Sequence, residues 1–237
     1  MGDSFPQNHR LWIQLQFQFT IEWEKPEYVQ LPGSNGGFAG EGERQIAMRE
    51  RENTPRAGIP GLRGTDHFGI TVPDLDEAHH FFVSVLGCEH VYTVGPFLPE
   101  GDWMRENLNV HQATVMREAR LYRCVTGSNY EVFHYESPGQ TLTPPANSDV
   151  GGNHIALYVD DLDQAVTYLR ECGVRVLGEA HHSSGASAGQ RWVYFLSPWG
   201  QQFELVSFPT GKAYETQTAA RLWDPRFPGE PSGQEPS

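Results

Sequence analysis

The sequence predicts an α+β fold of tandem βαβββ modules that form a curled mixed sheet around a metal-binding pocket. Two observations carry this prediction. The first is an internal repeat: residues 64–78 (GTDHFGITVPDLDEA) align with residues 151–165 (GGNHIALYVDDLDQA) at an offset of 87, with seven of fifteen positions identical. The second is that both copies continue into the same order of helical and strand-like segments. Two copies with so long a period favour one paired domain over a solenoid.

Each repeat opens with an apolar strand that ends at an aspartate, Asp74 or Asp161. An Asp with Glu or Gln three residues later is typical of a helix start, because the Asp oxygen accepts the first free backbone N–H groups. Apolar residues then recur at helical spacing over 78–86 and 162–172. The sequence therefore predicts one helix after the first strand of each repeat.

Each predicted helix is followed by a glycine, Gly87 or Gly173, where a left-handed C-terminal cap is expected. Strand-like sequence then turns back on itself within residues 121–135 and again within residues 192–208. These hairpins complete a β-α-β-β-β order in both repeats.

The repeats set the predicted domain boundaries. One domain covers residues 61–210, with modules at about 61–138 and 148–210. Residues 1–60 are expected to be a partly flexible N-terminal extension, and residues 211–237 a C-terminal tail rich in Pro, Gly and Glu.

Composition excludes several classes of function. The formal net charge is −13, from 17 basic and 30 acidic residues, without a Lys/Arg cluster that would bind nucleic acid or an anionic membrane. The sequence contains no run of 18 apolar residues, so no membrane-spanning segment is predicted. The three cysteines form no CxxC pair, so a disulfide scaffold is not expected and a cytoplasmic location is the simpler interpretation.

Four repeated polar residues are the candidate site. His67 and His154 lie in the first strand of each repeat, and Glu131 and Glu204 lie in the last. A Glu in an apolar strand is costly unless it is paired or bound, and here it occurs twice at matched places. Two imidazoles and two carboxylates suit one divalent metal ion, with Fe, Mn, Co, Ni and Zn all open. A six-coordinate metal would keep two positions for water or substrate.

The candidate ligands, the other histidines and the long insertion each also have a purely structural interpretation. A lone strand His or Glu is more often structural, and recurrence is what favours the metal site. His134 lies three residues from Glu131 and so points to the opposite sheet face. His181 and His182 are expected in an exposed Gly/Ser-rich loop. Residues 95–112 are expected to be either a lid or a plain surface loop.

The repeat starts DHFGITVPDLDEA and NHIALYVDDLDQA, with the ends YEVFHYE and FELVSFP, resemble the vicinal oxygen chelate superfamily. This superfamily includes glyoxalase I, extradiol dioxygenases, fosfomycin-resistance enzymes and bleomycin-binding proteins. The resemblance covers about 150 of the 237 residues. It implies that the metal ligands are His67, Glu131, His154 and Glu204. Residues 189–215 also resemble the cyclitol epimerases of the 2-epi-5-epi-valiolone type.

The resemblance implies a small-molecule hydroxyketone substrate whose adjacent oxygens chelate the metal, and an isomerase, epimerase or lyase. Glu131 and Glu204 would then both bind the metal and transfer protons. An Fe(II) extradiol dioxygenase and a metal-free binding or resistance protein stay open as alternatives. A homodimer is also open, because modules of this superfamily pair within or between chains.

Overall fold

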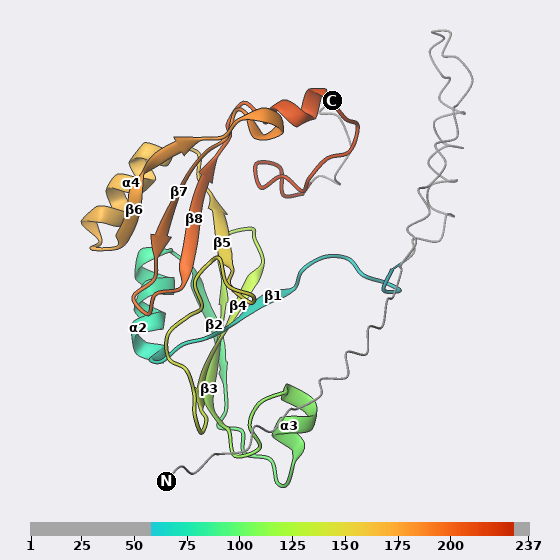
Figure 1. Ribbon diagram of the computed structural model, residues 1–237, viewed down its shortest axis with the longest axis vertical. Helices are drawn as coiled ribbons and strands as arrows, with labels where there is room; N and C mark the ends of the chain where they lie inside the picture. The colour runs from blue at the N-terminus through green and yellow to red at the C-terminus, as the bar shows by residue number, and fades with distance from the viewer. Residues whose placement is uncertain (1–57, 230–237) are drawn as a thin grey trace, which may run out of the picture. The chain divides into compact units, whose positions relative to one another are not determined.

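The computed structural model describes residues 58–229, so most of the expected N-terminal extension and the end of the tail lie outside the described residues. Two four-stranded sheets dominate the described part (Figure 1). The first module consists of β1 (His67–Thr71), α2 (Leu75–His80), η1 (Phe81–Val85), β2 (Glu89–Val94), α3 (Trp103–Leu108), β3 (Val115–Arg123) and β4 (Asn129–Glu136). The second consists of β5 (His154–Tyr158), α4 (Leu162–Glu171), β6 (Arg175–His182), η2 (Gly185–Ser187), β7 (Arg191–Leu196) and β8 (Gln202–Ser207), and the short helix η3 (Ala213–Thr216) follows it.

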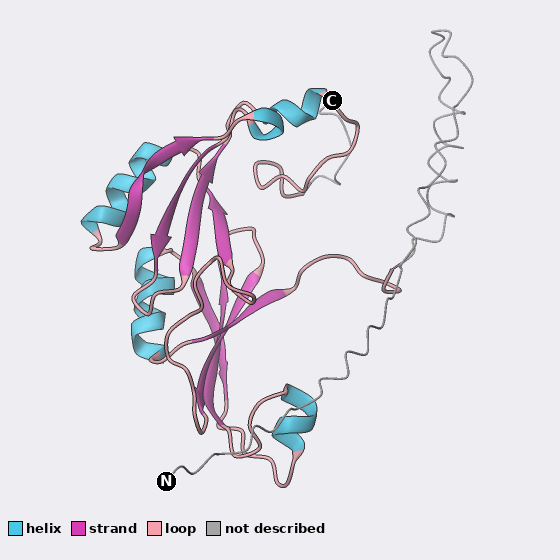
Figure 2. Ribbon diagram, viewed as in Figure 1, coloured by secondary structure: helices cyan, strands magenta, loops and turns pink. Residues whose placement is uncertain are grey.

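The tandem βαβββ fold is confirmed, and both modules have the same topology. Strand order is β1-β4-β3-β2 in one sheet and β5-β8-β7-β6 in the other, so the first and last strands of each module are neighbours. These neighbours run parallel, while the hairpin strands run antiparallel. We expected one curled sheet, and the structure has two open ones (Figure 2). The repeat predicts the pairing inside a module, because each module supplies its own hairpins, but it says nothing about pairing between modules.

Both predicted helix starts are confirmed. Asp74 accepts backbone N–H groups from Asp76 and Glu77, and Asp161 accepts one from Gln164. α4 packs against β6 and β8 (Figure 1), and α2 packs against β4. Gly87 (φ 73°) and Gly173 (φ 74°) adopt the left-handed conformation expected after the helices. Each helix therefore covers one face of its sheet and leaves the other face for the candidate site.

The first helix does not continue as a regular α-helix. Residues 81–85 form a π-helical turn, closed by the N–H of Leu86 donating to the carbonyl of Phe81. In this turn Phe81 and Phe82 are both buried. The wider turn lets two consecutive aromatic residues face the core.

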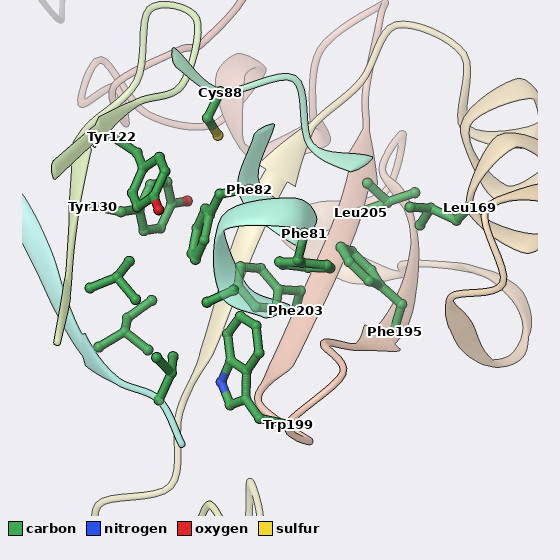
Figure 3. Close-up of a cluster of buried hydrophobic side chains, with 14 of the residues drawn as sticks. Phe81, Phe82, Cys88, Tyr122, Tyr130, Leu169, Phe195, Trp199, Phe203 and Leu205 are labelled. Atoms are coloured by element: carbon green, nitrogen blue, oxygen red, sulfur yellow. The ribbon is translucent and has the colours of Figure 1, made fainter. Parts of the chain in front are cut away.

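These two side chains join the cores of the modules (Figure 3). Phe82 stacks on Tyr122 of the first sheet at 5.1 Å between ring centroids. Phe81 contacts Trp199 at 5.3 Å and Phe203 at 5.4 Å, both from the second module. The hydrophobic faces of both sheets thus share one core around η1, and the two modules belong to one compact unit.

Two sequence interpretations need correction. His181 and His182 are the last residues of β6 and pair with Trp192 and Arg191, so they do not lie in a loop. The register shifts between Leu177 and His181, and this irregularity lets the strand continue beyond the glycine at 178. The Gly/Ser-rich loop begins only after His182.

The cysteines also differ from expectation. Cys88 and Cys124 form a disulfide between the chain just before β2 and the chain just after β3. Glu89 and Arg123, their neighbours, are directly paired across the two strands. A separation of 36 residues hid this pairing, because the strand register that brings the two together cannot be read from cysteine spacing.

Residues 95–112 contain α3, anchored by the buried side chain of Met104. Trp103 lies against Phe97 and stays partly exposed. Whether this segment acts as a lid stays a prediction. Within residues 58–229 no helix is long and apolar enough to cross a membrane.

Candidate functional site

The first candidate pair lies on neighbouring strands. Glu131 on β4 is directly opposite Gly69 of β1, two residues along from His67, so His67 and Glu131 share one sheet face. His67 Nε2 lies 3.1 Å from Glu131 Oε2. The other ring nitrogen, Nδ1, lies 2.8 Å from Asp66 Oδ2. The imidazole is therefore held between two carboxylates.

The second pair has the same construction. Glu204 on β8 is opposite Ala156 of β5, again two residues along from the histidine. His154 Nε2 lies 3.2 Å from Glu204 Oε2, and His154 Nδ1 lies 3.2 Å from Asn147 Oδ1. The two sequence repeats therefore hold their His–Glu pairs in the same strand register and at nearly the same distance.

The chain brings the four predicted residues together as two pairs, not as one cluster. Among residues 58–229 no group of three or more His, Cys, Asp or Glu side chains is placed to hold one metal ion. We call His67 with Glu131 the N-terminal half-site and His154 with Glu204 the C-terminal half-site.

The two half-sites differ in burial. The side chain of Glu204 is 11% exposed, and that of Glu131 is 24% exposed. Burial raises the pKa of Glu204, although His154 and Lys212 act in the opposite direction. Asp66 raises the pKa of His67 through its hydrogen bond, and Glu131 adds to this. Burial therefore favours the protonated form of the Glu204 carboxyl group.

The donor atoms fit a divalent metal ion. Two ligands about 2.1 Å from one ion and at right angles to each other lie about 3.0 Å apart, close to the observed His–Glu spacings. Each Nδ1 faces an oxygen acceptor, so it can donate its proton there while Nε2 is directed at the glutamate. At 3.1 and 3.2 Å from Nε2, each glutamate can accept a hydrogen bond from this atom or share a metal ion with it. An acceptor behind the ring is also what histidine ligands usually have.

Sequence reasoning missed three residues around these pairs. Asp66 precedes His67 directly, but the repeat has Asn153 there, so the repeat did not single it out. Asn147 lies outside the aligned repeat and approaches His154 from a loop. Tyr194 stands opposite Glu204 on β7, and its ring lies 5.1 Å from that of His154. Strand alternation in residues 191–196 was the available signal for Tyr194.

Comparisons with known proteins identify the family. The family model of the Glyoxalase/Bleomycin resistance protein/Dioxygenase superfamily matches residues 66–195. A 2-epi-5-epi-valiolone epimerase from Actinomyces sp. is 46% identical over 170 residues, which are 71% of this chain and 92% of that protein.

Two solved structures are more distant. A glyoxalase family protein from Bacillus cereus has 19% identity and a TM-score of 0.49, over 63% of this chain and 98% of that chain. A fosfomycin resistance protein from Listeria monocytogenes has 18% identity and a TM-score of 0.43, over 62% and 93%. The family match and the epimerase relative are decisive: this chain belongs to the glyoxalase/bleomycin resistance protein/dioxygenase superfamily.

Proposed function

We propose that this protein is a metal-dependent epimerase that moves a proton beside the carbonyl of a small, cyclitol-like hydroxyketone. The observation that carries the proposal is the duplicated His–Glu pair, with each Nε2 facing a carboxylate at 3.1 and 3.2 Å. The relative from Actinomyces sp., named for its action on 2-epi-5-epi-valiolone, supports the reaction class and the kind of substrate.

His67, Glu131, His154 and Glu204 would hold the metal. When bound, the ion supplies a Lewis acid that polarises the substrate carbonyl and so acidifies the neighbouring C–H group. The choice among Fe, Mn, Co, Ni and Zn is open, since a mixed imidazole and carboxylate set accepts each of them.

The two glutamates would transfer the proton. An epimerase removes a proton from one face of a carbon and returns one to the other face, so it needs an acid–base group on each side. Glu204, whose pKa is raised by burial, suits the group that carries a proton during turnover. Glu131 would serve the opposite face.

A second copy of the chain would complete the site. Each chain carries two half-sites, and placing the N-terminal half-site of one copy against the C-terminal half-site of another gives two full sets of four residues. The face of the first sheet that holds Glu131 also carries Tyr92 and Val94, opposite Leu121 and Ala119. Tyr92 is 51% exposed and Val94 is 41% exposed. Exposed apolar residues beside a half-site favour contact with another protein surface.

The test combines composition with chemistry. Metal content per chain is measured after purification without chelators, and deuterium uptake from solvent into a cyclic hydroxyketone is followed by NMR. We expect one metal ion per complete site and uptake that Glu131→Gln and Glu204→Gln each reduce by about a hundredfold or more. Glu179→Gln, at an exposed surface position, is the matched control.

Four outcomes would contradict the proposal or one of its parts. Uptake that survives both glutamine substitutions would exclude the two glutamates as proton carriers. Oxygen consumption with catechols would favour the dioxygenase alternative. Protein without stoichiometric metal that still binds the hydroxyketone tightly would favour the metal-free binding protein. A monomer in solution with full activity would exclude the shared site.

A further inference from the structure

A row of aromatic rings extends from the C-terminal half-site across the outward face of the second sheet. The ring of Tyr194 lies 5.1 Å from that of His154, and the ring of Trp192 lies 5.2 Å from that of Tyr194. His181 on β6 continues the row, 5.0 Å from Trp192. Three strands therefore contribute to one line of rings that begins at a proposed metal ligand.

Core packing does not explain this row. Along β7 the alternate residues Val193 and Phe195 are buried in the shared core, whereas Trp192 and Tyr194 are only partly buried. Neighbours along a strand point to opposite faces, so Trp192 and Tyr194 lie on the face opposite the core. A large aromatic surface left beside a candidate active site is typical of a ligand contact.

The internal repeat provides a comparison within the same chain. In the second module Tyr194 stands directly opposite Glu204, and Trp192 stands opposite Val206. In the first module the residue opposite Glu131 is Leu121, and the residue opposite Phe133 is Ala119. The two half-sites thus share the His–Glu pair but differ in where their aromatic residues lie. Tyr194 and Trp192 are on β7, beside the strand of Glu204, whereas Phe133 and Tyr135 are on the same strand as Glu131.

We propose that Trp192, Tyr194 and His181 form a platform that binds the ring of a cyclic polyhydroxy ketone. This platform rests on the proposed function, because it presupposes that the substrate lies at the His154–Glu204 pair. The faces of such a ring present polarised C–H bonds, which pack favourably on the electron-rich faces of aromatic rings. Its hydroxyl groups lie at the ring edge, where the Trp, Tyr and His side chains offer polar atoms. An open-chain hydroxyketone has no comparable flat face, so the platform selects for rings.

The platform also makes the substrate bind in one orientation. Because Trp192 and Tyr194 both belong to the second module, a ring on the platform lies against the C-terminal half-site in every site. In the shared site proposed above, Glu204 would lie beside the platform and Glu131 would come from the other copy. This asymmetry is what an epimerase needs to distinguish the two faces of one carbon.

The test compares a ring ketone, 2-keto-myo-inositol, with the open-chain dihydroxyacetone. Trp192→Ala introduces the residue that the first module has at the matching position, and Tyr194→Leu does the same at the second position. We expect each to raise the KM for deuterium uptake into the ring ketone about tenfold, with a smaller change in kcat. The preference for the ring over the open-chain ketone should fall by the same factor, and Trp192→Phe should restore most of it.

Trp223→Ala is the control, because Trp223 is a partly exposed tryptophan whose ring is not part of the row. Calorimetric titration of the full-length protein with the ring ketone measures binding without relying on turnover. Binding weakened about tenfold by Trp192→Ala supports the platform even if the wild type shows no deuterium uptake, a result that would refute the proposed function alone. Unchanged ring preference and unchanged binding in folded Trp192→Ala, or no binding by the wild type, would overturn the platform.

Discussion

Replacing Asp66 with Asn should weaken the proposed metal binding about tenfold, although Asp66 is not itself one of the proposed ligands. The Asp66 carboxylate accepts from His67 Nδ1 at 2.8 Å and so fixes the ring with Nε2 toward Glu131. Loss of such a supporting acceptor typically lowers metal affinity by about 10- to 100-fold. The lower end applies here because the Asp66 side chain is 88% exposed, and water can replace part of the lost interaction.

The assay is a competition titration of metal-free protein and a chromophoric chelator with Zn²⁺ or Co²⁺. Asn147→Ala provides a graded comparison, because Asn147 makes a neutral and longer contact to His154, at 3.2 Å, and should cost less. Asp102→Asn, in a surface ion pair on α3, is the control and should leave affinity unchanged. If Asp66→Asn binds the metal as tightly as the wild type does, His67 is not held by Asp66 for metal binding and the reasoning fails.

Three further predictions concern stability. Phe81→Ala should lower the free energy of unfolding by about 3–5 kcal/mol, read from denaturant midpoints, because it removes a buried ring between the two modules, whereas the partly exposed Phe68→Ala should cost far less. Asp161→Ala should cost about 1 kcal/mol by removing the cap of α4, and Glu171→Ala on the same helix should cost almost nothing. The pKa of Asp224 is lowered chiefly by its hydrogen bond to an arginine, so its stabilising effect is present above its ordinary pKa and is lost as the pH falls below about 4. The difference in melting temperature between wild type and Asp224→Asn should therefore shrink between pH 6 and pH 3, and a constant difference would contradict the assignment.

The local structure was predictable where one residue type has one physical reason to be there. Asp74 and Asp161 mark helix starts because an Asp oxygen can accept the free N–H groups of a first turn. The histidines and glutamates of the two pairs could be found because a buried strand carboxylate is costly and this one recurs. For the helix starts the signal lies within a few residues of its effect, and for the pairs it lies in the repeat itself, at an offset of 87 residues.

Long-range pairing could not be predicted in the same way. Cys88 meets Cys124 only through the register of β2 and β3, on either side of a long insertion. His181 belongs to a strand because β6 resumes its pairing after an irregularity near Gly178, a position that reads locally as a loop. The repeat fixed the symmetry between modules, but symmetry alone did not say that the four candidate residues would form two separate pairs.

The divergence between the two half-sites carries functional information that their similarity does not. The proposed metal ion would take one His and one Glu from each module, and the His–Glu pair and its strand register are alike in both. A substrate that is chemically different on its two sides needs unlike surroundings. Tyr194 and Trp192 in place of Leu121 and Ala119, together with the deeper burial of Glu204, provide that difference. The positions that are alike in both modules therefore suit metal binding. The positions that differ, Tyr194 and Trp192, are where mutation should change the choice of substrate.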